Sequence, residues 1–522
     1  MVKTGCTGLG MFTDRLFSLA LAALAFAAGA TQAIAGSGLP TVHIAAGDLA
    51  GTSFDPIGVV SFSNIPFAAP PVGPLRWAPP QPAAPWKGVR EAMAFGPACP
   101  QPVNKDGRIN GGGYAGPTSE DCLNLNVVGP KGARGAPVLV WIFGGANVFG
   151  ANSVASYNGQ NFARDGVIVV TVNYRLGALG FFAHPALTRA ARPGEPLGSY
   201  AIMDQLAALN WVQKNIAAFG GDPKNVTVAG ESAGGGNILT LLSTSAAKGL
   251  FARAMVESGG GWGRQTSLAK AEADGQALAV RLGAPADATP EQLRALPVDA
   301  LVAASGRYGP IVDGRLLTET PTEAFARGDN IHTPLIIGSN SFEASLMLSF
   351  GIPSGPYLAT IPAETKALYA KEAPDEGTLA HAVFTDQIMG APARWIAGKS
   401  SAAAPTWLYY FSYVRVKQRT RLPGANHASE IPYVFESQDQ IPVYSSEIVD
   451  EDRGVARLMH ACIVGFVRTG APACPTGQLW PAYQTASDQL LEFGLSSGVR
   501  TRWRKPQLDA AEDQESALIN GK

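Results

Sequence analysis

Charged residues are scarce in this chain, and the two signs nearly balance. Asp, Glu, Lys and Arg make up 16% of the 522 residues, and the formal net charge is −1. Proteins that bind a nucleic-acid backbone or an anionic membrane surface usually carry a basic excess. The sequence therefore predicts no nucleic-acid partner. Hydrophobic residues make up 46%, which is typical of a globular chain and excludes a disordered one.

Cysteine and histidine are also few, with five and six residues respectively. No two cysteines have the Cys-x-x-Cys spacing that is typical of zinc and dithiol redox sites. We therefore expect neither a metal ion nor a cofactor. The small number of histidines also means that any chemistry needing an imidazole base has few candidates.

Long apolar runs are absent except at the N-terminus. Lys3 and Arg15 accompany a run of Leu, Ala and Phe at residues 17–30, and Ala33-Ile34-Ala35 follows it. This order is typical of a signal peptide, which we predict to span residues 1–35. A membrane anchor is the alternative, but the run is short for a bilayer span. We expect an exported protein, periplasmic or secreted, with no membrane anchor after signal cleavage.

Short apolar or β-branched runs recur along the rest of the chain and predict buried parallel strands. They lie at residues 138–142, 167–172, 225–229, 254–256 and 334–338. Between two of them, residues 200–218 have apolar side chains at helical spacing. Alternating strands and helices predict an α/β fold with a central, mostly parallel sheet.

The chain has no linker long enough to separate two domains, so we predict a single domain over residues 36–505. The Pro-rich and Gly-rich beginning predicts a small antiparallel edge, and the Ala-rich residues 360–400 predict helices of a cap. Residues 506–522 are polar and charged, which is typical of a disordered C-terminal tail.

One short motif predicts a nucleophile. Gly230-Glu231-Ser232-Ala233-Gly234 fits G-x-S-x-G directly after a predicted strand and before a predicted helix. This context is that of a nucleophile elbow, in which a strained turn exposes the serine oxygen beside a helix N-terminus. A plain tight turn is the alternative for the five residues alone. The context favours Ser232 as a nucleophile.

A serine nucleophile needs a base and an acid, which follow it in the order serine, acid, histidine in enzymes with this elbow. Four histidines follow Ser232, namely His332, His381, His427 and His460. His381 and His460 lie in predicted helices and His332 precedes a strand, whereas His427 lies in a loop after an aromatic strand. Glu343, in a loop after the strand 334–338, is the candidate acid; an exposed loop glutamate is the alternative.

A Gly-rich loop follows the predicted strand 138–142. Its sequence is Phe143-Gly144-Gly145-Ala146-Asn147, and loops of this kind present backbone N–H groups to a developing oxyanion. The alternative is another tight turn. An alanine N–H donates as well as that of glycine, but the methyl group of Ala146 disfavours a positive φ by about 1 kcal/mol.

These motifs together resemble those of the type-B carboxylesterase family, whose members have the α/β-hydrolase fold. The matching segments occur in the family's order over nearly the whole mature chain. They are residues 65–73, 75–77, 119–127, 172–177, 219–223, 231–235 and 427–433.

The resemblance implies a role for each matching residue. The nucleophile, acid and base would be Ser232, Glu343 and His427. The oxyanion donors would be the N–H groups of Gly145, Ala146 and Ala233, and the residues supporting the triad would be Glu231 and Ser258. Two buried ion pairs would be Arg76 with Glu120 and Arg175 with Asp204.

Some residues depart from the family pattern. The neighbours of Glu343 are Phe342 and Ala344 instead of the usual Asp and Gly. The loop between Cys99 and Cys122 has no Trp, which cholinesterases use to hold a quaternary ammonium. A choline ester is therefore not the expected substrate.

Export changes the interpretation of the cysteines. Cys6 lies in the predicted signal peptide, and the other four would be in an oxidising compartment. We expect a disulfide between Cys99 and Cys122. For Cys462 and Cys474 a bridge remains open, since Cys462 can also be a buried thiol in a helix.

The resulting prediction is a serine carboxylesterase that hydrolyses small-molecule esters through an acyl-enzyme. A lipase or a thioesterase on the same fold is an alternative, as is a non-catalytic cholinesterase-like binding protein. Retention of all three triad candidates argues against the last.

Overall fold

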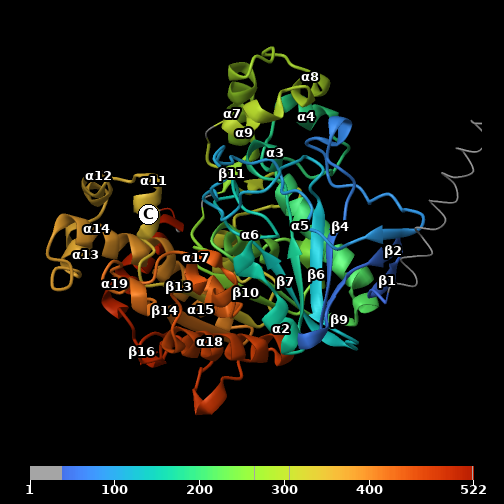
Figure 1. Cartoon of the computed structure of the whole chain (residues 1–522). Coiled ribbons are helices and arrows are strands. Elements are labelled where there is room, and N and C mark those ends of the chain that lie inside the picture. The colour runs from blue at the N-terminus through green and yellow to red at the C-terminus, as the bar shows by residue number, and fades with distance from the viewer. Residues whose placement is uncertain (1–37, 264, 305, 520, 522) are drawn as a thin grey trace, which may run out of the picture.

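The computed structural model describes residues 38–263, 265–304, 306–519 and 521 (Figure 1). The predicted signal peptide, residues 1–35, lies outside these residues. Within them, no helix has the length and the apolar character needed to cross a membrane.

An eleven-stranded sheet occupies the centre of the molecule, in the order β16-β15-β14-β13-β10-β9-β7-β8-β6-β4-β3. Seven adjacent strands of it run parallel. They are β7 (Ala136–Ile142), β8 (Ile168–Val172), β9 (Gly221–Glu231), β10 (Arg253–Glu257), β13 (Leu335–Asn340), β14 (Thr406–Phe411) and β15 (Gln489–Phe493). Each of the five strands predicted from apolar runs is confirmed.

The edges of the sheet are antiparallel, as predicted for the N-terminal part. At one edge, β6 (Asn124–Pro130), β4 (Val59–Pro66) and β3 (Thr52–Phe54) pair antiparallel, and β6 joins β8. At the other edge, β16 (Gly498–Thr501) pairs antiparallel with β15.

The parallel strands are covered on both faces. Every residue of β8 is buried, although successive side chains of a strand point to opposite faces. Helices α5 (Tyr200–Asn215), α6 (Ala233–Leu242) and α18 (Asp450–Thr469) pack against these strands. The predicted helix 200–218 is α-helical to Asn215, and a 3₁₀ turn continues it to Phe219.

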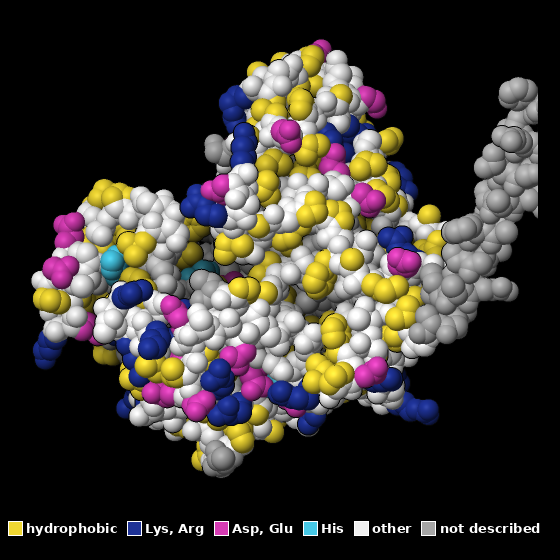
Figure 2. All heavy atoms as spheres, viewed as in Figure 1, with side chains coloured by type: hydrophobic (Ala, Val, Ile, Leu, Met, Phe, Trp, Pro, Cys, Tyr) yellow, Lys and Arg dark blue, Asp and Glu magenta, His cyan; other side chains and the backbone are white. Residues whose placement is uncertain are grey.

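Two helical lobes project from the sheet (Figure 1), and the surface between them is hollowed (Figure 2). One contains α7 (Leu268–Arg281), α8 (Pro290–Arg294) and α9 (Val298–Ala303). The other contains α11 (Ser345–Phe350), α12 (Ser354–Ala359), α13 (Ala363–Ala367) and α14 (Glu376–Thr385), with a small core of its own. The predicted cap 360–400 is thus helical, but its second half, α15 (Ala391–Ser401), packs on β13 and β14 instead.

The expectation of a disordered C-terminal tail is wrong, because helix α19 (Lys505–Ile519) forms there. Leu508 and Ala511 are buried on it. The guanidinium group of Arg394, on α15, contacts Asp509 at 2.5 Å and Glu512 at 2.7 Å. The charges that suggested a solvated tail therefore attach this helix to the body of the protein.

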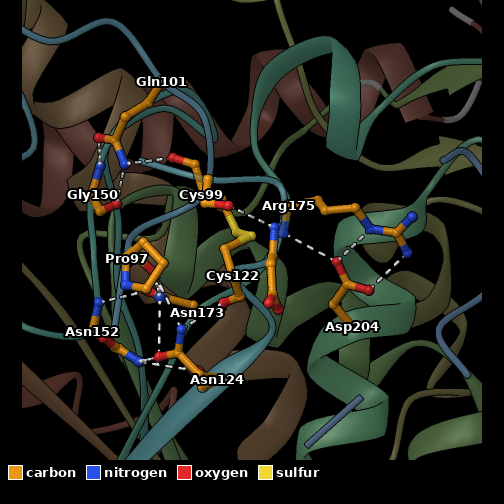
Figure 3. Close-up of a disulfide and its surroundings, with 12 residues drawn as sticks. Pro97, Cys99, Gln101, Cys122, Asn124, Gly150, Asn152, Asn173, Arg175 and Asp204 are labelled. Carbon is orange, nitrogen blue, oxygen red and sulfur yellow. Dashed lines mark hydrogen bonds and ion pairs between the residues drawn. A yellow bond between two sulfur atoms is a disulfide. The ribbon is translucent and has the colours of Figure 1, made fainter. Parts of the chain in front are cut away.

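Two disulfides are present. Cys99 and Cys122 are bonded, with 5.0 Å between their Cα atoms, as predicted. Figure 3 shows that buried amide side chains surround this bond. Among them Gln101 exchanges two hydrogen bonds with the backbone of Gly150, at 2.7 and 2.9 Å. Cys462 and Cys474 are also bonded, so the alternative of a free buried thiol at Cys462 is wrong.

The two ion pairs that the resemblance implied are present. Arg175 contacts Asp204 through two hydrogen bonds of 2.8 and 2.7 Å, in a site from which solvent is excluded (Figure 3). Arg76 likewise makes a bidentate contact with Glu120, through hydrogen bonds of 2.7 and 2.6 Å.

Removal of the first disulfide is expected to lower the free energy of unfolding by about 3 kcal/mol, because it frees a loop of 23 residues in the unfolded chain. The variant is Cys99→Ala with Cys122→Ala, measured by urea unfolding of oxidised protein. Wild type unfolded with a reductant present is the comparison and should lose at least as much, because the reductant also opens the Cys462–Cys474 bond. A loss below about 1 kcal/mol would contradict this expectation.

Candidate active site

Ser232 lies in a sharp turn between a strand and a helix. Strand β9 ends at Glu231 and helix α6 begins at Ala233, and Ser232 between them has φ 54° and ψ −123°. A Cβ atom on Gly230 or Gly234 would lie 2.4 or 2.1 Å from the carbonyl oxygen of Ile142. Only glycine therefore fits at either position, which explains the G-x-S-x-G pattern in steric terms.

Hydrogen bonds join Ser232, His427 and Glu343 in a row. The Ser232 Oγ atom lies 2.7 Å from His427 Nε2, and His427 Nδ1 lies 2.6 Å from Glu343 Oε2. The Glu343 side chain is fully buried, and that of His427 is 10% exposed. The structure thus brings together three side chains that lie far apart in the sequence.

The side chains of Glu343 and His427 reach this place because their loops follow neighbouring strands. Glu343 follows β13 and His427 follows β14, and these strands are paired in parallel, so both loops leave the same edge of the sheet. The loops are bonded to one another, since the Phe342 N–H donates to the Ala425 carbonyl at 2.9 Å. The His427 N–H also donates to Ser345 Oγ at 3.0 Å.

The second oxygen of the Glu343 carboxylate is held by two donors. Ser258 Oγ donates to Oε1 at 2.6 Å, and the backbone N–H of Asn340 donates to the same atom at 2.7 Å. These bonds fix the carboxylate so that Oε2 faces the imidazole. The sequence suggested Ser258 but not Asn340, whose contact arises from the backbone at the end of β13.

Glu231 approaches the same imidazole nitrogen as the serine does. Its Oε1 atom lies 3.0 Å from His427 Nε2. Burial raises the pKa of Glu231 to about 7, against the opposing effect of His427. Burial by itself lowers the pKa of the His427 imidazole, but Glu231 and Glu343 raise it more strongly, so that its pKa lies well above 6.5.

Two further glutamates, Glu257 and Glu430, are buried close to these side chains, and the sequence predicted no role for either, although Glu430 lies in the matching segment 427–433. Glu257 ends β10 in register with Glu231 on β9, and both are buried. Burial raises the pKa of Glu257 well above its usual range, and Glu430 and Glu231 add to this effect. Burial also raises the pKa of Glu430, and Glu231 and Glu343 add to this effect. Burial therefore favours the neutral form of both carboxyl groups.

The Gly-rich loop after β7 contacts the serine turn. A Cβ atom on Gly144 would lie 2.6 Å from the Glu231 carbonyl oxygen and 3.0 Å from Ser232 Cβ. Among the described residues, no hydrogen-bond acceptor is found for the N–H groups of Gly145 and Ala146. The N–H of Ala233 belongs to the first residue of α6, where no intrahelical acceptor exists.

Ala146 has φ 56°, a left-handed conformation. Its methyl group therefore carries a strain of about 1 kcal/mol that glycine would not have. The loop tolerates this strain because Tyr174 Oη donates to the Phe143 carbonyl at 2.6 Å and fixes the beginning of the loop.

The other candidate histidines contact other parts of the molecule. His460 lies between the Val434 carbonyl and the Asp165 carboxylate, at 2.7 and 3.1 Å. His381 packs edge-on against the ring of Phe342. His332 precedes β13 in a loop.

Solved structures with the same architecture cover nearly all of the described chain. A PNB esterase matches with a TM-score of 0.78 and 31% identity, covering 90% of this chain and 99% of its own. A carboxylesterase of Geobacillus stearothermophilus matches with a TM-score of 0.77, 32% identity and the same coverage.

Among curated proteins, three relatives named as esterases or hydrolases match over most of their length. A fumonisin B1 esterase of Sphingopyxis macrogoltabida is 33% identical over 87% of this chain and 86% of its own. A para-nitrobenzyl esterase of Bacillus subtilis is 34% identical over 83% and 91%. A phenmedipham hydrolase of Pseudarthrobacter oxydans is 30% identical over 87% and 95%.

The fold, the site and these relatives define a carboxylic ester hydrolase of the α/β-hydrolase fold. The sequence model of the carboxylesterase family matches residues 38–373 and 359–511. The chain belongs to the carboxylesterase family, and the predicted fold class and family resemblance are confirmed.

Proposed function

We propose that this esterase acts through an acyl-enzyme formed on Ser232, with His427 as general base and Glu343 as the acid that orients it. The observation that carries the proposal is the row of two short hydrogen bonds from Ser232 Oγ through His427 to Glu343. A nucleophile, its base and an orienting carboxylate in this relation form a serine-hydrolase triad.

The reaction follows from these contacts. As Ser232 Oγ attacks the ester carbonyl carbon, His427 Nε2 takes the hydroxyl proton, and the carboxylate of Glu343 stabilises the imidazolium. The tetrahedral intermediate then collapses, its bond to the alcohol oxygen breaks, and His427 returns the proton to that oxygen. A water molecule, whose proton His427 accepts, next attacks the acyl group on Ser232. This step releases the carboxylic acid product and restores the serine hydroxyl.

The negative charge of the tetrahedral intermediate needs donors that other groups have not engaged. We assign this role to the N–H groups of Gly145, Ala146 and Ala233. The contact of the Gly144 backbone with Ser232 supports the assignment, as does the position of Ala233 at the start of α6. Each such donor contributes about 3 kcal/mol to transition-state stabilisation in related chemistry.

Rapid mixing with p-nitrophenyl acetate tests the proposal. A burst of p-nitrophenol close to one per active site is expected, followed by a slower steady rate, because this activated ester acylates the serine faster than water removes the acetyl group. Mass spectrometry of the quenched enzyme should find the acetyl group on Ser232. Steady turnover with neither a burst nor an acylated serine peptide would overturn the acyl-enzyme.

The value of kcat/KM is expected to rise with pH through a midpoint above 6.5. The base must be neutral to accept a proton, and a raised pKa keeps the imidazole protonated to higher pH. Glu231→Gln removes one of the carboxylates that raise this pKa, so the midpoint should fall by about one unit. The measurement is a pH profile with spontaneous hydrolysis subtracted.

The exposed Glu364 on α13 supplies a matched control, since Glu364→Gln also removes one carboxylate but far from the imidazole. Its profile should coincide with that of wild type. A midpoint that Glu231→Gln leaves unmoved would show that Glu231 does not set the protonation of His427.

We further propose that the protein is exported and acts on small-molecule esters. The two disulfides support export, since such bonds persist in oxidising compartments. The names of the relatives, which are esterases and hydrolases of small molecules, support the substrate class.

A further inference from the structure

We propose that Asn147 is a positioning residue. Together with Asn237 it fixes the distance between the two parts of the oxyanion hole, the Gly-rich loop and the N-terminus of α6. The proposal rests on the function proposed above and extends it to a pair of side chains outside the triad. Asn147 follows Ala146 in the Gly-rich loop, and Asn237 lies on α6, whose first residue is Ala233.

Asn147 joins three different segments of the chain. Its Oδ1 atom accepts a hydrogen bond from Asn237 Nδ2 at 3.0 Å, and its Nδ2 atom donates to the Tyr308 carbonyl at 3.2 Å. Its own carbonyl accepts from the Gly177 N–H at 2.7 Å. The side chain is 6% exposed, and φ is 59°. Among residues with side chains, asparagine adopts this left-handed conformation at comparatively low cost.

The orientation of both amides follows from one fixed acceptor. The Tyr308 carbonyl can only accept, so the NH₂ group of Asn147 must face it. The oxygen of the same amide then faces Asn237, which must present its own NH₂ group. An aspartate at either position has nearly the same shape as asparagine, but one of its carboxylate oxygens would face an oxygen of the partner without a proton between them.

The pair matters because it bridges the two sources of oxyanion donors. Asn237 lies four residues after Ala233, which places it one helical turn along the same face of α6. Asn147 is bonded directly to Ala146. The amide pair therefore fixes the separation of the loop donors, Gly145 and Ala146, from the helix donor. Oxyanion donors act only within a narrow distance of the developing charge.

Asn237→Ala and Asn147→Gly test this inference, the glycine keeping the left-handed backbone free of strain. Both should lower kcat for p-nitrophenyl acetate about 10- to 100-fold, less than the loss of a whole donor. KM should stay within about threefold, because the interaction develops in the transition state. Affinity for a trifluoromethyl ketone, which forms an oxyanion with the serine, should fall in parallel with kcat.

The double variant provides a second readout. Because both substitutions remove the same hydrogen bond, their effects on kcat should not multiply, and the double variant should lose little more than the worse single one. Thr240→Val is the matched control. Thr240 is buried on the same helix, and its hydroxyl donates to the Gly236 carbonyl at 3.0 Å. Its loss should affect the stability of α6 and leave kcat near wild type.

Three results would overturn the inference. The first is that kcat and the ketone affinity of Asn237→Ala lie within twofold of the values for Thr240→Val. The second is that the losses of kcat in the two single variants multiply in the double variant. If Asn237→Ala or Asn147→Gly fails to fold, Asn237→Asp is measured in its place. The third result that would overturn the inference is an affinity of Asn237→Asp for the trifluoromethyl ketone equal to that of wild type. Failure of the proposed function is distinct, because it would appear as retained turnover in Ser232→Ala.

Discussion

Replacement of Ser232 by alanine is expected to lower kcat by about 10⁶-fold. The substitution removes the nucleophilic oxygen and leaves His427 with no proton to take. The left-handed backbone at residue 232 is equally strained with either side chain, so the free energy of unfolding should change little. The measurement is steady-state hydrolysis of p-nitrophenyl acetate, with urea unfolding of the same preparation.

Ser243→Ala is the matched control for this variant. Ser243 follows α6, and its hydroxyl donates only to the Leu239 carbonyl, at 2.8 Å. That variant should keep wild-type kcat. Residual turnover in Ser232→Ala within tenfold of wild type would refute the assignment of the nucleophile.

Replacement of Glu343 by glutamine is expected to lower kcat by about 10⁴-fold, as an amide does when it replaces the acid of other serine triads. The reason lies in the two donors on Oε1. The Asn340 N–H can only donate and so requires an acceptor there, and the Ser258 hydroxyl can donate to the same atom, so the amide oxygen takes that place. The NH₂ group then faces His427 Nδ1, which must accept, and the ring proton moves to Nε2. An imidazole in that tautomer has no lone pair for the serine proton.

Two measurements separate this effect from misfolding. Affinity for a non-reactive substrate analogue and the urea midpoint should both stay near wild type in Glu343→Gln. Ser258→Ala in the Glu343→Gln background should restore none of the lost kcat, because the Asn340 N–H still requires the amide oxygen at that place. A kcat loss of less than tenfold in Glu343→Gln would refute the role of this carboxylate.

The parts of the site that depend on local sterics could be predicted from the sequence. The elbow needs glycine at 230 and 234 because a carbonyl oxygen of the neighbouring strand lies against both, and that demand appears as a five-residue motif. Glu343 and His427 could be selected as candidates for the acid and the base because each follows a recognisable buried strand, and the structure brings the two side chains together. The strands themselves were predictable because burial on both faces requires continuous apolar runs.

What could not be predicted depends on contacts between distant segments. Glu257 meets Glu231 only through the register of two strands, and Asn147 meets Asn237 across 90 positions of the chain. Helix α19 was interpreted as a tail because its charges suggested solvation. Those charges are satisfied by Arg394, more than 100 positions away, and no local pattern reports such a partner.

The hydrogen bond between the loops of the acid and the base has a consequence for how this enzyme can vary. The chain leaves the sheet after β13, builds the lobe of α11–α14, and passes through α15 and β14 before it reaches Ala425, the bonded partner of Phe342. The base of the lobe is closed by a bond of its own, from the Ala344 N–H to Thr385 Oγ1 at 3.2 Å. Because the two ends of the lobe are joined at Ala344 and Thr385, and the two loops at Phe342 and Ala425, we expect the lobe to tolerate changes in length and composition without movement of Glu343 or His427. Exchange of residues 346–384 between relatives is then expected to alter which esters are accepted while the chemistry stays the same.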